Sequence, residues 1–173
     1  MDNSIHCQFL GGCSEVGSLS MVLEVDGLRL LFEYGMTPSK PPTYPLPPPP
    51  VDLTLLTHAH LDHSGMIPWL FTRYDQKIIT TQLTSEVTDL LHKDSIKIAK
   101  SEGYAIPYNN SDVKEAKNSI LPVTPFQKRK SIILLHSYIF YFKIVSESKK
   151  IGHYELRVKA QSFTRQRGER NIF

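Results

Sequence analysis

The sequence predicts an α/β fold, a sandwich in which strands and helices alternate along the chain. Short apolar runs bounded by turn residues indicate strands, and amphipathic stretches that begin at capping residues indicate helices. The two kinds of segment alternate through the middle of the chain, which is typical of helices layered on a sheet. With 173 residues, of which 40% are apolar and 21% charged, the chain can bury one core of ordinary size.

Strands and turns dominate the first part of the chain. Residues 19–25 and 28–32 are apolar, and the Asp-Gly dipeptide between them is a typical hairpin turn, so they predict a β-hairpin. Most of the prolines lie in residues 38–50, which excludes a helix or a central strand and indicates a stiff surface loop. Residues 52–57 form a short apolar run that predicts a buried strand.

Helices begin to alternate with strands after this point. Pro68 suits the first turn of a short helix, and residues 77–80 predict another strand. A cap at Thr84 or Ser85 predicts a long helix that ends near Glu102. We expect its apolar side chains to form the buried stripe of this helix: Val87, Leu90, Leu91 and Ile98.

The last third of the chain is less regular. A shorter helix is expected over residues 111–119, one or two strands over 132–145, and a further strand over 151–160. After Ala160 the apolar pattern fails and the chain becomes basic. We therefore expect residues 1–160 to form a partial domain and residues 161–173 an atypical basic tail.

Composition indicates the cellular location of the protein but does not identify its substrate. A net charge of +3 is compatible with an anionic substrate without identifying one. Cys7 and Cys13 make no disulfide framework, which favours a reducing, cytoplasmic location. The sequence shows no signal peptide, and no apolar run approaches the roughly 20 residues that span a bilayer, so we expect no association with membranes.

Four metal-ligand side chains are concentrated directly after the strand expected at residues 52–57. Residues 58–63 read His-Ala-His-Leu-Asp-His. His58 and His60 can point the same way and bind one metal ion, and Asp62 and His63 can reach a second ion about 3.5–4 Å away. A water bridging the ions would be the nucleophile. The alternatives are a single structural zinc site, which usually contains cysteine, and a polar loop that happens to be rich in histidine.

Residues 57–65, Thr-His-Ala-His-Leu-Asp-His-Ser-Gly, resemble the signature of the metallo-β-lactamase superfamily. Residues 10–17 and 30–36 are similar to the opening of its β-CASP branch, and residues 94–99 and 111–116 also resemble that branch. The branch contains the nuclease of the cleavage and polyadenylation machinery. The resemblance implies an αββα sandwich, two Zn²⁺ ions, hydrolysis of RNA phosphodiesters and possible homodimers.

The resemblance also implies a role for each site residue. His58 and His60 would bind one zinc ion, and Asp62 and His63 the other. Asp62 would also hold the attacking water as a catalytic residue. Glu33 stands where the family usually has aspartate, and it would support the metal ligands from behind.

The later ligands of the family are not found where the resemblance places them. The family has a histidine after the strand that residues 151–160 resemble, but Gln161 stands there and no histidine follows His153. His92, His136 and His153 are not expected to be ligands. The β-CASP module would lie beyond residue 173, so for the chain as given we expect an incomplete sandwich, weak metal binding and impaired activity.

A shifted reading frame is one explanation for the altered tail. Codons for residues 161–167, read one base later, can encode a Ser-His-Ser-Pro-Gly-Ser segment of the kind that the family has at this point. The alternative is a diverged tail. Genomic DNA without a His-x-Pro-Gly motif in either alternative frame would exclude the frameshift.

Three functions remain open at this point. The first is a ribonuclease-type metal hydrolase of the β-CASP kind, and the second is a related hydrolase that acts on a thioester or an ester. The third is a non-catalytic remnant. The glycine-rich opening at residues 10–17 favours the first, whereas the missing ligands favour the third.

Overall fold

The computed structural model describes residues 5–25, 27–124, 131–135, 138–145 and 155–162. The chain forms two compact units, Met1–Thr124 and Pro125–Phe173. Each unit is described by itself. No helix among the described residues is long and apolar enough to cross a membrane.

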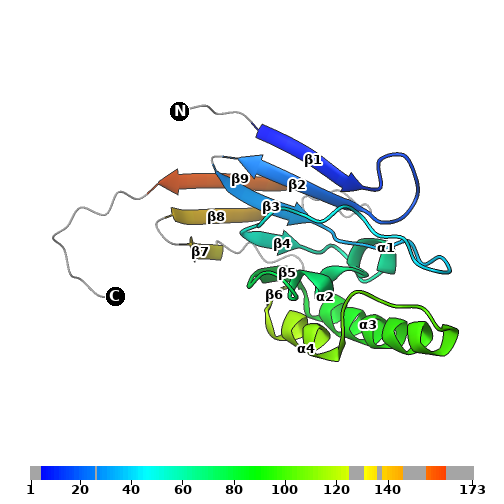
Figure 1. Ribbon diagram of the computed structural model, residues 1–173. Coiled ribbons are helices and arrows are strands. Elements are labelled where there is room, and N and C mark those ends of the chain that lie inside the picture. Colours follow the sequence, from blue (N-terminus) through cyan, green and yellow to red (C-terminus); the bar gives the residue numbers. More distant parts are fainter. Residues whose placement is uncertain (1–4, 26, 125–130, 136–137, 146–154, 163–173) are drawn as a thin grey trace. The chain divides into compact units, whose positions relative to one another are not determined.

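The first unit is built on a six-stranded sheet with strands in the order in which they occur in the sequence (Figure 1). Its first three strands are antiparallel, and β3 to β6 are parallel. The strands are β1 (Ile5–Gly11), β2 (Ser20–Val25), β3 (Leu28–Phe32), β4 (Leu53–Leu55), β5 (Lys77–Thr81) and β6 (Ile120–Val123). Parallel strands need crossover connections, and helices lie in the connection between β4 and β5 and in that between β5 and β6.

The predicted hairpin is confirmed. Strands β2 and β3 pair antiparallel from Met21 opposite Phe32 to Val25 opposite Leu28. The strand predicted at residues 52–57 is also present but shorter, because only Leu53–Leu55 pair with neighbouring strands. The chain therefore leaves the sheet before Thr57, and the histidine motif begins outside the last ladder hydrogen bonds.

Four helices accompany the sheet: α1 (Leu61–Ser64), α2 (Ile67–Leu70), α3 (Gln82–Glu102) and α4 (Asn110–Asn118). Pro68 lies in the first turn of α2, as predicted. The prediction of Thr84 or Ser85 as the cap of the long helix is wrong. Helix α3 begins directly after β5, so the last strand residue, Thr81, is the cap, and its hydroxyl accepts the Thr84 N–H at 3.1 Å.

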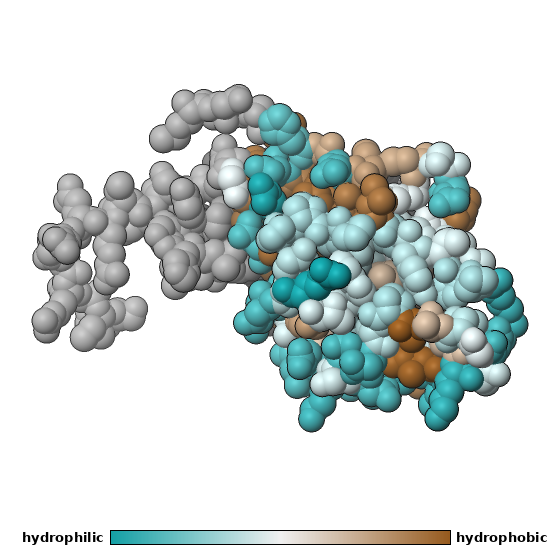
Figure 2. All heavy atoms as spheres, viewed as in Figure 1, coloured by the Kyte–Doolittle hydropathy of each residue, from teal (hydrophilic) through white to brown (hydrophobic). Residues whose placement is uncertain are grey.

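The predicted buried stripe of α3 is also wrong. Of its four members, Leu90 is 66% exposed, Val87 and Ile98 are exposed as well, and Leu91 is half-buried. Leu83, outside the predicted stripe, is 70% exposed. The helix instead buries a face of small or polar side chains: Ser85, Thr88, His92, Ser95 and Ala99. Small side chains permit a close approach to the neighbouring elements, and this packing outweighed the apolar pattern. Figure 2 shows apolar side chains at the surface in the helical region.

The core of the first unit lies between the helices and one face of the sheet. Leu31 from β3 and Ile78 from β5 meet Leu70 from α2 and Val113 from α4 in one cluster of buried side chains. Leu30 and other side chains that alternate with these are buried outside this cluster. Both faces of the sheet are thus apolar, as expected for a parallel sheet within a sandwich.

The second unit contains a three-stranded antiparallel sheet of β7 (Ser131–Leu135), β8 (Tyr138–Val145) and β9 (Glu155–Ser162). Residues 132–145 therefore contribute to two strands. The strand expected at 151–160 is found as β9, which continues through Gln161 and Ser162. The remaining residues of the expected basic tail, 163–173, lie outside the described residues.

The burial of α2 and α3 predicts a large loss of stability for one leucine truncation and almost none for another. Leu70 is completely buried, so Leu70→Ala is expected to lower the free energy of unfolding by about 2–5 kcal/mol. Leu90 is mostly exposed, so Leu90→Ala is expected to change it by less than about 0.5 kcal/mol. Urea unfolding of both variants measures this difference, and equal losses would contradict the observed orientation of α3.

Candidate metal centre

The histidine motif occupies the turn that follows the carboxyl end of β4. His60 precedes α1, and its carbonyl accepts the N–H groups of His63 and Ser64 at 2.9 and 2.8 Å. This single turn brings Asp62 and His63 back toward the residues before it. The imidazole of His60 makes no capping hydrogen bond to the helix.

All four predicted ligand side chains lie together. The ring centroid of His58 lies 4.8 Å from that of His60 and 4.0 Å from that of His63. Nε2 of His63 lies 3.6 Å from Oδ2 of Asp62. The side chains of Asp62 and His63 are 35% and 21% exposed, so the group is reachable from solvent.

Two residues next to the four candidate ligands, Thr57 and Glu33, contact the histidines among them. The Thr57 hydroxyl lies 2.9 Å from Nδ1 of His58, which leaves Nε2 of that ring for another partner. The Glu33 carboxyl group is 5% exposed, accepts the Thr57 N–H at 3.2 Å and lies 3.6 Å from Nδ1 of His63. Glu33 reaches this place from a left-handed backbone conformation, with φ at 57°.

Burial governs the electrostatics of the group. It lowers the pKa values of His58 and His63, and the neighbouring imidazoles lower them further. A neutral imidazole has the free lone pair that a metal ion requires. Burial also raises the pKa of Glu33 to about 7, against the hydrogen bonds from Thr57 that favour its charged form.

The donor set fits a zinc ion, although the side chains are not in a ligating arrangement. No three His, Cys, Asp or Glu side chains in the described part of the chain are placed to hold one ion. Three imidazoles and a carboxylate are nonetheless ligands that Zn²⁺ accepts. Nδ1 of His63 is buried with no hydrogen-bond partner and faces Glu33. With Nε2 of His63 on a metal ion, that Nδ1–H would be directed at the Glu33 carboxylate.

Helix α1 is held in place through all four of its backbone carbonyls. Each accepts a hydrogen bond from a donor elsewhere in the chain: Met36 N–H to Leu61, Leu19 N–H to Asp62, Tyr34 N–H to His63, and His92 Nε2 to Ser64, at 2.8–2.9 Å. A four-residue helix has little stability of its own, so these contacts determine where the ligands lie.

Gly35 allows the chain after β3 to approach α1 closely. A β-carbon at this position would overlap the carbonyl oxygen of Asp62 and come within 2.6 Å of the His63 nitrogen. Gly35 also donates its N–H to the Leu19 carbonyl at 3.0 Å. Any larger residue would push apart the two segments that fix the ligands.

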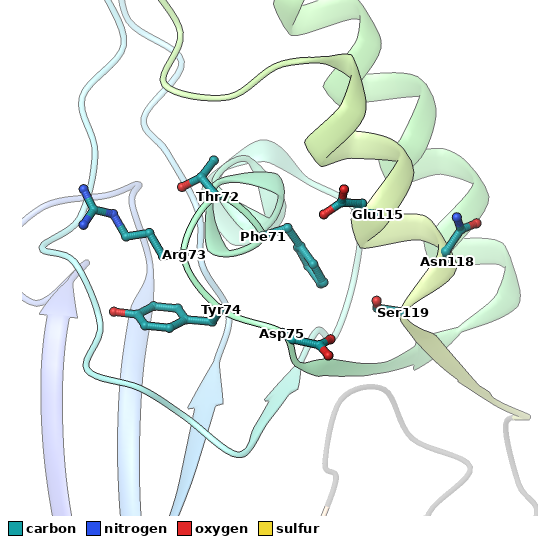
Figure 3. A pocket seen from close by; sticks show the side chains of 8 residues that line it. All are labelled: Phe71, Thr72, Arg73, Tyr74, Asp75, Glu115, Asn118 and Ser119. Carbon is teal, nitrogen blue, oxygen red and sulfur yellow. The ribbon is translucent and has the colours of Figure 1, made fainter.

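A surface cavity lies away from this group. It has a volume of about 540 Å³ and is lined by residues of the α2–β5 connection and of α4, among them Phe71, Asp75 and Glu115 (Figure 3). None of the four candidate ligands lines it. The candidate site is therefore the histidine turn and not this cavity.

The sequence predicted that the four candidate side chains lie together, and the structure brings them together; it did not predict the contacts of Thr57 and His92. His92 was not expected to be a ligand, and the structure agrees, because Nε2 of its buried ring is bonded to Ser64. The signal for His92 is its spacing from the small residues Thr88 and Ser95, which share its helix face. His136 and His153 lie outside the described residues.

A substitution of Gly35 is expected to disturb the metal centre and not only the fold. The clash in Gly35→Ala should lower the free energy of unfolding by about 1–3 kcal/mol and weaken Zn²⁺ binding, measured by calorimetry. Gly103→Ala is the matched control, because Gly103 has φ at 76° with open space around it, and it ends α3. It should destabilise by about 1–2 kcal/mol without affecting Zn²⁺. Equal effects on Zn²⁺ would contradict the role of Gly35.

Acid is expected to destabilise the protein through His92. Burial lowers the pKa of His92 from its ordinary value of 6.5 to about 4. The unfolded chain therefore binds the extra proton between these values, and the contribution of His92 to stability falls by up to about 1.4 kcal/mol per pH unit as the pH decreases through this window. Urea unfolding at several pH values should show a shallower slope for His92→Gln. An identical slope would contradict the burial of this group.

Comparison with known proteins identifies the family. Residues 14–133 match the profile described as "Metallo-beta-lactamase superfamily". "Probable RNase MJ4" of Methanocaldococcus jannaschii is 39% identical over 125 residues, which cover 70% of this chain and 29% of that protein. "Transcription termination factor FttA" of the same organism is 35% identical over 130 residues, which cover 70% of this chain and 20% of that protein.

One comparison is with a solved structure. An archaeal metallo-beta-lactamase superfamily protein from Sulfolobus tokodaii aligns with a TM-score of 0.45 and 14% identity, over 91% of this chain and 60% of that one.

The chain spans less than a third of the length of the two curated relatives. The family match covers well over half of the chain and includes the histidine turn, so the chain belongs to the metallo-beta-lactamase superfamily.

Proposed function

We propose that this chain carries part of the metal site of a hydrolase that cleaves RNA phosphodiesters, of the β-CASP type. The observation that carries this proposal is the convergence of three imidazoles and one carboxylate on a single turn. The similarity to a protein named as a probable RNase supports RNA as the substrate class. The chain's net charge of +3 is compatible with a polyanion.

Each residue of the turn has a distinct role in this proposal. His58 and His60 would hold one zinc ion, while Asp62 and His63 would hold the other. Zinc, when bound, supplies a water of lowered pKa and stabilises charge that develops on the phosphate. The Asp62 carboxylate orients the attacking water as a hydrogen-bond acceptor. The relatively exposed Asp62 side chain supports this role.

Glu33 and Thr57 orient the ligands without touching the substrate. The longer side chain of Glu33, compared with the aspartate that the family usually has, still reaches both the Thr57 N–H and the His63 ring. A carboxylate facing the non-ligating nitrogen fixes the tautomer of a ligand histidine. The Thr57 hydroxyl does the same for His58. These contacts support a site organised for metal and not a polar surface loop.

Metal binding by this chain is expected to be weak. His92 is engaged with Ser64, so the described residues near the turn offer only four ligand side chains for two ions. Zinc sites usually have at least three protein ligands for each ion. We therefore propose that cleavage by this chain is impaired. The exposed free thiols of Cys7 and Cys13 support a reducing compartment, and we propose the cytoplasm.

Removal of the Asp62 carboxylate tests this assignment. Asp62→Ala is expected to weaken Zn²⁺ binding by about 10-fold or more, because a direct ligand is lost. Asp94→Ala, at an exposed position on α3, is the matched control and should bind Zn²⁺ like the unmodified chain. Calorimetric titration measures both. Equal binding by both variants would contradict the role of Asp62.

Substrate assays complete the test. With added Zn²⁺, we expect little or no cleavage of single-stranded RNA by the chain and no further loss in Asp62→Ala. RNA cleavage that Asp62→Ala abolishes would show that the site is competent as it stands. Hydrolysis of a thioester in preference to RNA would contradict the proposed substrate class.

A further inference from the structure

The carbonyl of Ser64 lacks the hydrogen bond that a continuing helix would provide. In an α-helix this carbonyl would accept the N–H of the residue four positions later. That residue is Pro68, which has no N–H. Ser64 is completely buried, so water cannot easily replace the missing donor.

His92 provides that donor from α3. Its Nε2 lies 2.8 Å from the Ser64 carbonyl oxygen, and because a carbonyl only accepts, Nε2 carries the proton. The ring is 2% exposed and packs edge-on against Tyr108, with centroids 5.9 Å apart. Both contacts fix the ring in one orientation.

Helix α3, which carries this donor, is itself held in place by a cap and by an ion pair. Its first turn is capped by Thr81, and Asp89, one turn before His92, contacts Lys117 of α4 at 2.8 Å. Ser64 in turn connects both halves of the ligand motif. It directly follows His63, and its hydroxyl donates to the carbonyl of Ala59, between His58 and His60, at 2.9 Å.

We propose that His92 is a positioning residue for the metal ligands, acting through Ser64 to hold α1 and the preceding turn in one place. The proposal rests on the proposed function, because it concerns the same four ligands. The other three donors to α1 are backbone N–H groups of Leu19, Tyr34 and Met36. His92 is the one side chain among these four donors, so it alone can be removed without changing the main chain.

Zinc titration of three variants tests the proposal. His92→Leu fills similar space without a donor and should bind Zn²⁺ about 10-fold or more weakly, as expected when a group that orients ligands is lost. His92→Gln carries an amide N–H at about the same depth and should recover most of this affinity. Val113→Ala, a truncation of a buried residue of α4, controls for general loss of stability and should bind like the unmodified chain.

Amide exchange of the metal-free protein provides a second readout. In His92→Leu, the N–H groups of Ser64 and Gly65, which close α1, should exchange at least several-fold faster, whereas the N–H of Ile78 in β5 should not change. Both rates should return toward normal in His92→Gln.

The two readouts separate the two claims. Unchanged exchange in α1 of His92→Leu, or unchanged Zn²⁺ affinity in that variant, would overturn the positioning role. Failure of the unmodified chain to bind Zn²⁺ would instead overturn the proposed function, and the exchange rates alone would then decide whether His92 holds α1.

Discussion

The candidate metal centre depends on the hydrogen bonds that external donors make to the carbonyls of α1. This helix is one turn long and cannot be stable in isolation. Its position is set by backbone N–H groups from Leu19, Tyr34 and Met36 and by the ring of His92. Because helix carbonyls are fixed relative to the side chains of their own turn, anchoring these oxygens also places Asp62 and His63.

The sheet makes this anchoring possible. Leu19 directly precedes β2, and Tyr34 and Met36 follow β3, so the same end of the hairpin supplies three of the donors. The absence of a side chain at Gly35 allows close contact, and Glu33 turns through a left-handed conformation to face His63. The segment from Glu33 to Met36 therefore has two roles: it bonds the backbone of α1 and it places a carboxyl group behind its histidine.

The orientation of α3 also serves the anchoring of α1. A helix with exposed Leu83 and Leu90 and with buried Ser85 and His92 does not maximise apolar burial. Its buried face instead brings small side chains against its neighbours and one donor against Ser64. The fourth carbonyl of α1 requires that donor, because Pro68 has no N–H to offer. The polar face of α3 thus supplies the donor that the proline of α2 cannot supply.

The sequence by itself determined the features that depend on near neighbours. The strands on either side of Gly27, the end of α3 at Gly103 and the gathering of His58, His60, Asp62 and His63 follow from local periodicity, turn residues and the pitch of one helical turn. Only the tertiary structure decided which face of α3 is buried, that Thr81 caps this helix, and that Thr57 and His92 make hydrogen bonds to the histidine turn. The contact between His92 and Ser64 joins two helices 28 positions apart, and the fit between packed surfaces is not encoded in the periodicity of either segment.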